Sequence, residues 1–118
     1  ALSGDLGSGK TTFVQGFAQG LGIKDKIISP TFVLIRQHKI PKTKKTLYHI
    51  DLYRLDSPEQ FRDLGLKEII DNPDNVVLIE WAEKAGDLIP KDAIKIHFEI
   101  IDPDSIGVDQ NTRKITIN

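Results

Sequence analysis

The chain has 118 residues, a formal net charge of −1 and 28% charged residues, the balance of an ordinary soluble globular domain. This near-neutral charge excludes a strong overall attraction to nucleic acid or membranes. The absence of cysteine excludes disulfides, zinc–thiolate sites and cysteine nucleophiles. No apolar run approaches the roughly 18 residues of a membrane span. We therefore expect a single domain over residues 1–118 and, because disulfides are absent, a cytoplasmic location.

The start of the chain is unusual for the motif that it carries. No methionine is present, and Ala1-Leu2-Ser3 leads directly into a glycine-rich loop. Such a loop normally follows a buried strand of about five residues. We expect that only the end of this strand is present and that the sequence lacks its natural N-terminal part.

The first half of the chain predicts a helix followed by a hairpin. After the loop at 4–10, residues 10–21 place apolar side chains on one helical face, at Phe13, Val14, Phe17, Ala18 and Leu21. A strand is expected at 31–39. A basic turn at 40–46 and a second strand at 47–52 then complete an antiparallel hairpin.

The second half alternates between helices and strands. Ser57 and Pro58 mark the start of a helix that runs toward Ile70 and is weakened by Gly65. Four elements follow: a fully buried strand at 76–79, a short helix at 83–88, a strand at 94–100 with one wet face, and its hairpin partner at 113–117. This order predicts an α/β protein with the P-loop NTPase fold. Its central sheet is mixed but mostly parallel, flanked by helices, and carries an antiparallel hairpin.

The segment Gly4-x-x-x-x-Gly9-Lys10-Thr11 matches the P-loop pattern at every fixed position. Glycines let main-chain amides turn toward a phosphate without a Cβ clash, and the following helix offers its positive N-terminus to the anion. Lys10 is placed to reach the β- and γ-phosphates, and Thr11 to offer its hydroxyl to magnesium. A chance glycine-rich turn is the alternative, but the strand end before the loop and the amphipathic helix after it favour a phosphate site.

Two predicted strands end in an acid, Asp51 and Glu80. P-loop enzymes use a carboxylate at a strand end to hold magnesium or to orient the attacking water. Glu80 follows the apolar run at 76–79, so we expect it at the sheet edge beside the loop. Either acid is otherwise a solvated strand end. Trp81 comes next and is either a core residue or a cover over the nucleotide.

Three further features leave alternatives open. Thr31 occupies a loop where many P-loop proteins sense the γ-phosphate, although a lone threonine there is usually a turn residue. His49 shares a strand face with Asp51, and we expect it to orient that carboxyl without forming a metal cluster. A basic run favours a solvated hairpin, with contact to RNA or to an acidic partner as the alternative; it comprises Arg36, His38, Lys39, Lys42, Lys44 and Lys45.

Four motifs stand in a characteristic order along the chain. They are Gly4-Asp5-Leu6-Gly7-Ser8-Gly9-Lys10-Thr11-Thr12-Phe13, Ser29-Pro30-Thr31-Phe32, His49-Ile50-Asp51-Leu52-Tyr53-Arg54-Leu55 and Ile79-Glu80-Trp81-Ala82-Glu83. Together they resemble the TsaE (YjeE) family, the bacterial ATPases of tRNA threonylcarbamoyladenosine biosynthesis. The order and spacing match over nearly the whole chain. The loop alone is common, whereas the other three motifs are far more specific.

The resemblance implies ATP and Mg²⁺ as ligands. It implies that Thr11 and Glu80 bind magnesium. It places Thr31 in a switch-like loop and Asp51 near the γ-phosphate. The expected catalytic set is therefore Lys10, Thr31, Asp51 and Glu80, and the expected nucleotide-contacting set is Asp5, Leu6, Gly7, Ser8, Gly9, Lys10, Thr11, Thr12 and Trp81. Family members also have a helix and a full strand before the loop, so part of base recognition lies in a segment that this sequence lacks.

The resemblance also implies partners. These are two mutually homologous subunits, of the TsaB and TsaD type, one of which transfers the threonylcarbamoyl group to adenosine 37 of tRNAs that read codons beginning with A. The ATPase does not make that bond, and its nucleotide cycle resets the complex between turnovers. Slow hydrolysis by the chain alone and indirect contact with tRNA are therefore expected, with no role for a membrane.

Three alternative functions make different demands on the sequence. A small-molecule P-loop kinase would bring several arginines over the phosphates from a lid, but the chain has four arginines and no arginine-rich segment. A GTPase would need an Asn-Lys-x-Asp element to read guanine, and none is present. A nucleotide-dependent adaptor, whose bound state matters more than its hydrolysis, is partly compatible with the family.

Overall fold

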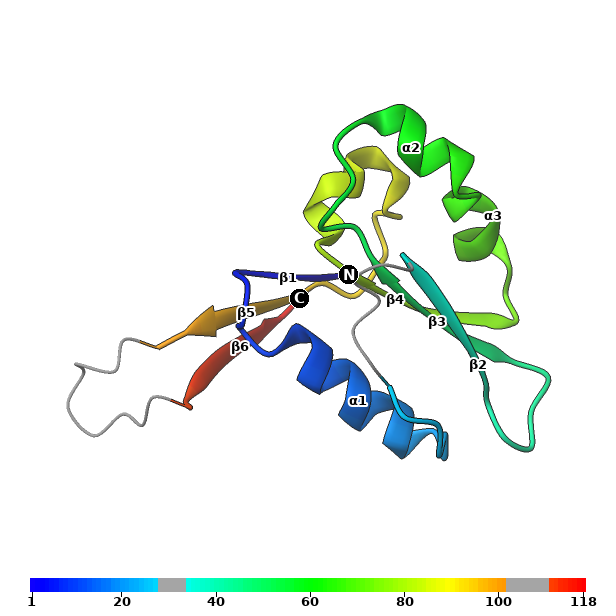
Figure 1. Cartoon of the computed structure of the whole chain (residues 1–118), viewed down its shortest axis with the longest axis horizontal. Coiled ribbons are helices and arrows are strands. Elements are labelled where there is room, and N and C mark those ends of the chain that lie inside the picture. The colour runs from blue at the N-terminus through cyan, green and yellow to red at the C-terminus, as the bar shows by residue number, and fades with distance from the viewer. Residues whose placement is uncertain (28–33, 102–110) are drawn as a thin grey trace.

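The structure is a computed structural model that describes residues 1–27, 34–101 and 111–118. Within these ranges a six-stranded sheet runs through the centre of the molecule, in the order β2-β3-β4-β1-β5-β6 (Figure 1). Its strands are β1 (Leu2–Gly4), β2 (Ile35–Lys39), β3 (Thr46–Asp51), β4 (Asn75–Glu80), β5 (Ile96–Ile100) and β6 (Arg113–Ile117). The helices are α1 (Lys10–Gly20), α2 (Pro58–Asp63), α3 (Leu66–Asp71) and the 3₁₀ helix η1 (Ala82–Leu88).

The sheet is mixed but mostly parallel, which confirms the predicted fold class. β3, β4, β1 and β5 run parallel to one another, while β2 and β6 pair antiparallel along the two edges. Because the carboxyl ends of parallel strands meet at one edge, Gly4, Asp51 and Glu80 come together there. Asp51 lies directly opposite Glu80 in the register of β3 and β4.

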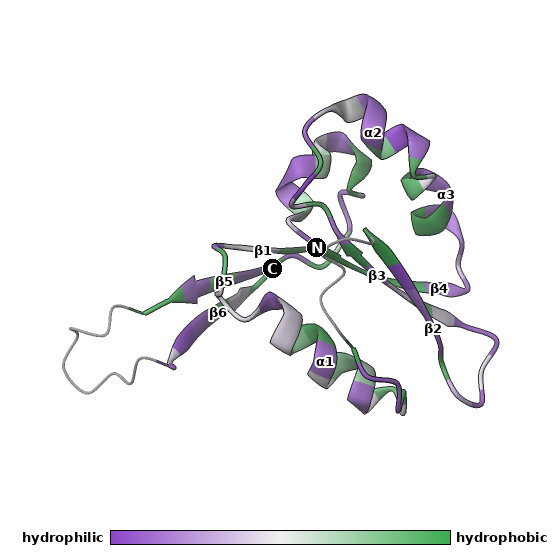
Figure 2. Ribbon diagram, viewed as in Figure 1, coloured by the Kyte–Doolittle hydropathy of each residue, from purple (hydrophilic) through white to green (hydrophobic). Residues whose placement is uncertain are grey.

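Helices cover both faces of the sheet. α1 lies on one side, and α2, α3 and η1 lie on the other (Figure 1). Both hydrophobic and hydrophilic residues occur along α1, as an amphipathic helix requires (Figure 2). Its Val14 and Ala18 are fully buried in the core on that side. The opposite core is built around Ile50, Leu52 and Leu66.

The two-residue period of the strands decides which side the polar groups face. In β3, Leu47 joins the α1-side core while Ile50 joins the other. His49 and Asp51 therefore share the face of Leu47. In β4, Leu78 lies on the α1 side and Ile79 on the other, so Glu80 faces α1 as well. Leu78 and Ile79 are both buried, which confirms the prediction of a strand covered on both faces.

The predicted hairpin forms, but its first strand is shorter than expected. β2 begins at Ile35, and Leu34 lies in a bend. Thr31 falls outside the described residues. The second strand, β3, matches its prediction within one residue at each end. The 94–100 strand is also shorter, because β5 begins at Ile96 and Ile94 is left exposed.

Glycine changes two of the predicted helices. The helix expected from Ser57 to Ile70 is two helices, broken where Gly65 adopts a left-handed φ of 69°. Ser57 forms the expected cap, and its capping box with Gln60 fixes the start of α2. The short helix after β4 is a 3₁₀ helix kinked at Gly86, whose φ is 53°. None of the helices in the described ranges is long and apolar enough to cross a membrane.

Candidate active site

The loop between β1 and α1 depends on glycine at both of its ends. Gly4 has a φ of 136°, and a Cβ there would lie 2.4 Å from the carbonyl oxygen of Phe98. No other residue fits without moving the main chain of β5. Gly9 is the residue before the helix and has a φ of 106°, so it also favours glycine. The loop therefore turns its main chain tightly from the sheet edge into the N-terminus of α1.

The Lys10 side chain is buried and folds back on this loop. Its Nζ donates to the carbonyl oxygen of Gly4 at 2.5 Å and to that of Asp5 at 3.0 Å, and it lies 4.3 Å from the centroid of the Trp81 ring. It forms no salt bridge with any carboxylate of the described residues. Burial lowers the pKa of this ammonium, although nearby carboxylates, Glu80 first, oppose the shift. The loop thus holds a cation without an ionic partner.

The Glu80 carboxylate is buried at the end of β4, where it accepts hydrogen bonds from two sides. The Thr11 hydroxyl donates to Oε1 at 2.9 Å and approaches Oε2 at 3.1 Å. His49 Nε2 lies 2.5 Å from Oε2. Since an ionised carboxylate only accepts hydrogen bonds, Nε2 carries the proton of this contact. Thr11, the second residue of α1, is in this way hydrogen-bonded to the end of β4.

His49 differs from its sequence-based expectation. We expected it to orient Asp51, with which it shares a strand face. Its hydrogen bond goes instead to Glu80 on the neighbouring strand. His49 is fully buried, and its Nδ1 has no hydrogen-bond partner among the described residues. In the register of β3 and β4, Glu80 lies opposite Asp51 and diagonal to His49, and its side chain, one methylene longer than that of Asp51, reaches back to Nε2.

Asp51 ends β3 beside Glu80 and is mostly buried, with 9% of its surface exposed. The main-chain N–H of Tyr53 donates to its Oδ1 at 2.9 Å. Burial raises the pKa of the Asp51 carboxyl, and the charge of Glu80 adds to this rise, while the Tyr53 amide opposes it. The carboxyl groups of Asp51 and Glu80 therefore lie together at this edge, close enough to Lys10 to act on its pKa.

Two aromatic rings, of Trp81 and Tyr53, lie beside Lys10 at the cavity. The Trp81 and Tyr53 rings lie 5.0 Å apart, tilted by 43°. The Lys84 ammonium donates a hydrogen bond to the Tyr53 carbonyl oxygen, and its Nζ lies 5.3 Å from the centroid of the Tyr53 ring. Trp81 itself has a left-handed φ of 58°, an uncommon conformation for a bulky residue. It is half-buried, so it is neither a full core residue nor a fully exposed cover.

A cavity of 430 Å³ collects these groups. Seven of the nine nucleotide-contacting residues predicted from the sequence line it, and Asp5 and Ser8 are the exceptions. Ser8 is buried with its hydroxyl 3.5 Å from Lys10 Nζ, whereas Asp5 is exposed. Of the predicted catalytic set, Lys10, Asp51 and Glu80 line the cavity, and Thr31 lies outside the described residues.

Two residues near the cavity were not expected. Tyr53 lines it, and its position two residues after Asp51 in the third motif was the signal that could have found it. Arg113 donates from Nη2 to the carbonyl oxygen of Gly7 at 3.3 Å. It reaches the loop from β6, more than 100 positions along the chain, and no local pattern could have predicted that contact.

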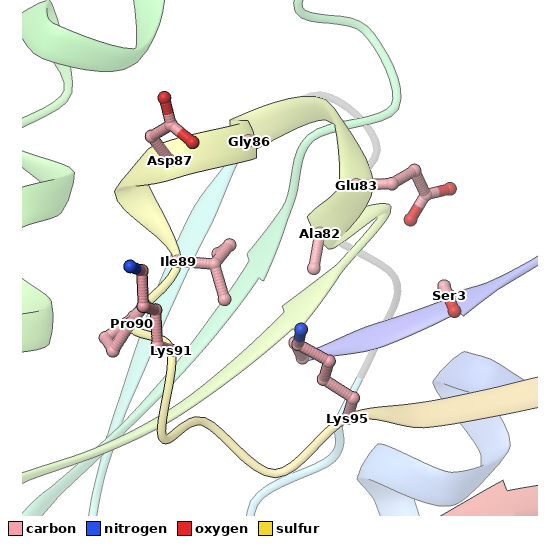
Figure 3. A pocket seen from close by; sticks show the side chains of 10 residues that line it. Ser3, Ala82, Glu83, Gly86, Asp87, Ile89, Pro90, Lys91 and Lys95 are labelled. Atoms are coloured by element: carbon pink, nitrogen blue, oxygen red, sulfur yellow. The ribbon is translucent and has the colours of Figure 1, made fainter. Parts of the chain in front are cut away.

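A second, larger hollow of 680 Å³ lies between η1 and the start of β1 and β5 (Figure 3). In this view Ala82 and Ile89 point into it, while Glu83 and Asp87 point outward from η1. Neither the glycines of the loop nor Lys10, Thr11, Asp51 or Glu80 line it. It is lined by the acids Glu83 and Asp87, but it lacks the phosphate-binding loop and the two strand-end carboxylates that the smaller cavity brings together.

The oxygen donors at the smaller cavity limit the kind of metal site that it offers. The described residues hold no group of three or more histidine and carboxylate side chains that could cage a metal ion. Thr11 and Glu80 instead provide a hydroxyl and a carboxylate in direct contact. Such hard oxygen donors suit magnesium, which keeps waters and substrate phosphates as its remaining ligands.

Comparison with known proteins identifies the family of the chain. The family model of the threonylcarbamoyl adenosine biosynthesis protein TsaE matches residues 1–109. The chain belongs to the TsaE family. The P-loop, His49, Asp51, Glu80 and Trp81 all lie inside the matched region.

Curated TsaE proteins of several bacteria are similar to this chain. The protein of Haemophilus influenzae is 40% identical over 101 residues, 86% of this chain and 62% of that protein. The protein of Rickettsia bellii is 43% identical over 104 residues, 87% of this chain and 69% of that protein. All are named tRNA threonylcarbamoyladenosine biosynthesis protein TsaE. The chain thus spans about two thirds of the length of these two TsaE relatives.

A solved structure shares the fold. The crystal structure of YdiB from Bacillus subtilis superimposes with a TM-score of 0.71 and 32% sequence identity. The match covers 98% of this chain and 64% of the YdiB chain. The TsaE fold described above is therefore also found in an experimentally determined relative.

Proposed function

We propose that this chain is the magnesium-dependent, ATP-binding and ATP-hydrolysing subunit required for N6-threonylcarbamoyladenosine modification of tRNA. In this proposal it acts in the cytoplasm on a partner transferase complex of the TsaB and TsaD type. Its relatives carry the name of that biosynthesis. One observation carries the proposal: an unpaired lysine, a hydroxyl and two carboxyl groups converge on one cavity at the N-terminus of α1.

The residues present fit a nucleotide phosphate. The loop turns between Gly4 and Gly9 with positive φ angles, and α1 begins directly after it. A helix N-terminus and the ammonium of Lys10 are both positive, and among the described residues this ammonium donates hydrogen bonds to two main-chain carbonyls and one hydroxyl. An incoming phosphate therefore replaces neutral partners of Lys10 and breaks no ion pair.

The residues also fit magnesium. In this proposal Thr11 and Glu80 would hold the ion, and their two oxygen groups are already in contact. When bound, magnesium would supply positive charge against the phosphate oxygens. Glu80 and Asp51 bring two acids to this edge of the sheet, and a divalent cation would offset their charge.

The remaining roles belong to side chains of the chain itself. Lys10 binds the β- and γ-phosphates through Nζ. Asp51, fixed at Oδ1 by the Tyr53 amide, has Oδ2 available to orient a water and accept its proton. A raised pKa makes a carboxylate a better proton acceptor, so the burial of Asp51 favours this role. Trp81 and Tyr53 cover one side of the phosphate-binding cavity.

Measuring ATP hydrolysis by the chain alone, and again with the two partner subunits, tests the proposal. We expect slow hydrolysis alone and a clear acceleration in the complex. An adaptor that works through its bound state would bind ATP and support modification without any acceleration. Failure to bind ATP in either setting would overturn the proposal. Because the sequence has no guanine-reading element, ATP is also expected to outcompete GTP in a binding titration.

A further inference from the structure

The fold brings two lysine-bearing segments together at the end of the sheet that is remote from the phosphate loop. One is the segment 21–27 after α1, and the other is the turn between β2 and β3. Both line a groove of 620 Å³, with Lys24 on one wall and Lys39 and Lys42 on the other. In Figure 1 the turn lies on the same side of the molecule as the C-terminal end of α1. We call the exposed set the lysine surface: Lys24, Lys26, Lys39, Lys42, Lys44 and Lys45.

The charges of the lysine surface are not neutralised locally. None of its six ammonium groups forms a salt bridge with a carboxylate of the described residues. Asp25, the acid between Lys24 and Lys26, lies 3.3 Å from His38. The whole chain has a net charge of −1, so the part outside the lysine surface is acidic. Segments 21–27 and 39–45 contain six lysines and one acid, Asp25, so these two segments are strongly positive although the whole chain is not.

The composition of the surface favours nucleic-acid backbone over a protein face. Protein interfaces are depleted in lysine and are anchored by aromatic or large apolar side chains. The exposed large hydrophobic residues of the described chain all lie elsewhere: Leu6, Tyr53, Ile94, Ile100, Ile115 and Ile117. Segments 21–27 and 39–45 also contain no aromatic residue on which an unpaired base could stack. Flexible point charges without such anchors match phosphates of a folded, base-paired RNA.

We propose that the lysine surface binds the phosphate backbone of tRNA, without reading its sequence. The inference rests on the proposed function, which supplies tRNA as the RNA at hand, and it adds a direct contact where only an indirect one was expected. The two sites do not compete for space. α1 separates them by about 16 Å, the length of an 11-residue helix. β3 likewise starts beside the turn and ends at Asp51 in the active site.

The test measures binding of a fluorescent tRNA transcript to the full chain by polarisation, from about 50 to 200 mM salt. Changing Lys42, Lys44 and Lys45 to Ala is expected to weaken binding roughly 10-fold or more at low salt. It should also reduce the slope of log K against log salt by about 3, since each of the three lost phosphate contacts removes nearly one unit. The matched control removes the same charge elsewhere, through alanine at Lys91, Lys95 and Lys114. This control should change affinity less than about 2-fold.

Three results would overturn the inference. One is absence of tRNA binding by the parent chain at low salt, and another is an equal loss in both triple variants, which would reflect net charge alone. The third is competition by poly-glutamate as effective as that by tRNA at equal charge, which would identify a site for an acidic protein. Binding of ATP by each variant, measured in parallel, keeps the two proposals separate. If the parent chain does not bind ATP, the proposed function is wrong. If it binds ATP but not tRNA, only the proposed tRNA contact of the lysine surface is wrong.

Discussion

His49 and Glu80 form a buried pair across neighbouring strands, with Nε2 of the imidazole 2.5 Å from Oε2 of the carboxylate. The imidazole is fully buried, so this contact cannot be replaced by water without rearrangement. Oε1 of Glu80 accepts a hydrogen bond from the Thr11 hydroxyl. The pair therefore fixes where a carboxylate points at the proposed magnesium site, as outer-shell partners of metal ligands commonly do.

The first prediction compares two changes at His49. His49→Leu removes the donor to Glu80 and should raise the magnesium concentration for half-maximal nucleotide binding roughly 10-fold or more. His49→Gln keeps an N–H at a similar distance and should restore most of the loss. In the parent chain without ligand, ¹⁵N spectra of the imidazole should show the proton on Nε2. If His49→Leu folds normally and needs no more magnesium than the parent, His49 does not position Glu80.

The second prediction uses the contact between Lys10 and Trp81. Trp81 is the only tryptophan of the chain, and Lys10 Nζ lies 4.3 Å from its ring centroid. A bound phosphate should draw this ammonium away and change the tryptophan fluorescence. Lys10→Ala should abolish that response to ATP and lower turnover by about 100-fold or more while the fold persists, because the side chain serves the ligand.

Lys84→Ala is the matched control for this experiment. Lys84 also lies near the Trp81 ring, at 6.0 Å, but it bonds to the Tyr53 carbonyl and does not line the cavity. Its removal should shift the starting fluorescence and preserve the response to ATP. Turnover by Lys10→Ala at the parent rate would contradict the assignment of the loop itself.

The third prediction concerns the stability of the ligand-free chain and its dependence on pH. Burial, above all, raises the folded-state pKa of the Asp51 carboxyl above its ordinary value of 3.8. A carboxyl with a raised pKa binds its proton more tightly in the folded state, so it destabilises the fold once it ionises. This penalty is absent below about pH 4 and grows as pH rises through the raised pKa. Asp51→Asn should therefore increase the melting temperature at pH 7, with the gain disappearing toward pH 4.

Thermal unfolding of both proteins over this pH range, without nucleotide or magnesium, measures the effect. The substitution can keep the hydrogen bond from the Tyr53 amide, because an asparagine oxygen accepts it in place of Oδ1. A change in melting temperature is then not caused by loss of this bond. An equal or lower melting temperature for Asp51→Asn at pH 7 would show that Asp51 is not a strained, buried charge. A gain that persists undiminished at pH 4 would point to a cause other than ionisation.

Features that depend on residues close together in the sequence could be predicted, whereas contacts between residues far apart in the sequence could not. The P-loop pattern, the strand ends at Asp51 and Glu80, and the capping signal at Ser57 are local, and the expected elements are found there. The partner of His49 and the approach of Arg113 to the loop depend on which strands become neighbours. Strand order is set by packing of the whole chain, so no local period could supply it. Gly65 shows an intermediate case, since its weakening effect was visible but its complete break of the helix was not.

The last prediction separates the roles of the two acids. Glu80 is held between Thr11 and His49, so its carboxylate is fixed beside the hydroxyl that is expected to bind magnesium. Within the described ranges, the side-chain hydrogen bond of Asp51 comes from the main-chain amide of Tyr53, and both residues line the cavity. Glu80→Gln should raise the magnesium requirement of nucleotide binding, because a neutral amide is a poorer ligand for a hard cation. The substitution also removes one acceptor, because the NH₂ group of glutamine cannot accept a hydrogen bond from Thr11 or His49. This loss should cost about 1 kcal/mol of stability.

Asp51→Asn should behave in the opposite way. Its amide oxygen can still accept the Tyr53 N–H, so binding of magnesium and ATP should stay nearly intact. Turnover should fall about 10-fold or more, the usual scale for loss of a positioned acid–base group. Titrating magnesium against a fluorescent ATP analogue, and measuring hydrolysis in the complex with the partner subunits, distinguishes the two variants. If Asp51→Asn carries the magnesium defect and Glu80→Gln does not, the roles of the two acids are exchanged. The buried bond from Thr11 to Glu80 would then hold the loop against the sheet, and Asp51 would be the acid that meets the metal.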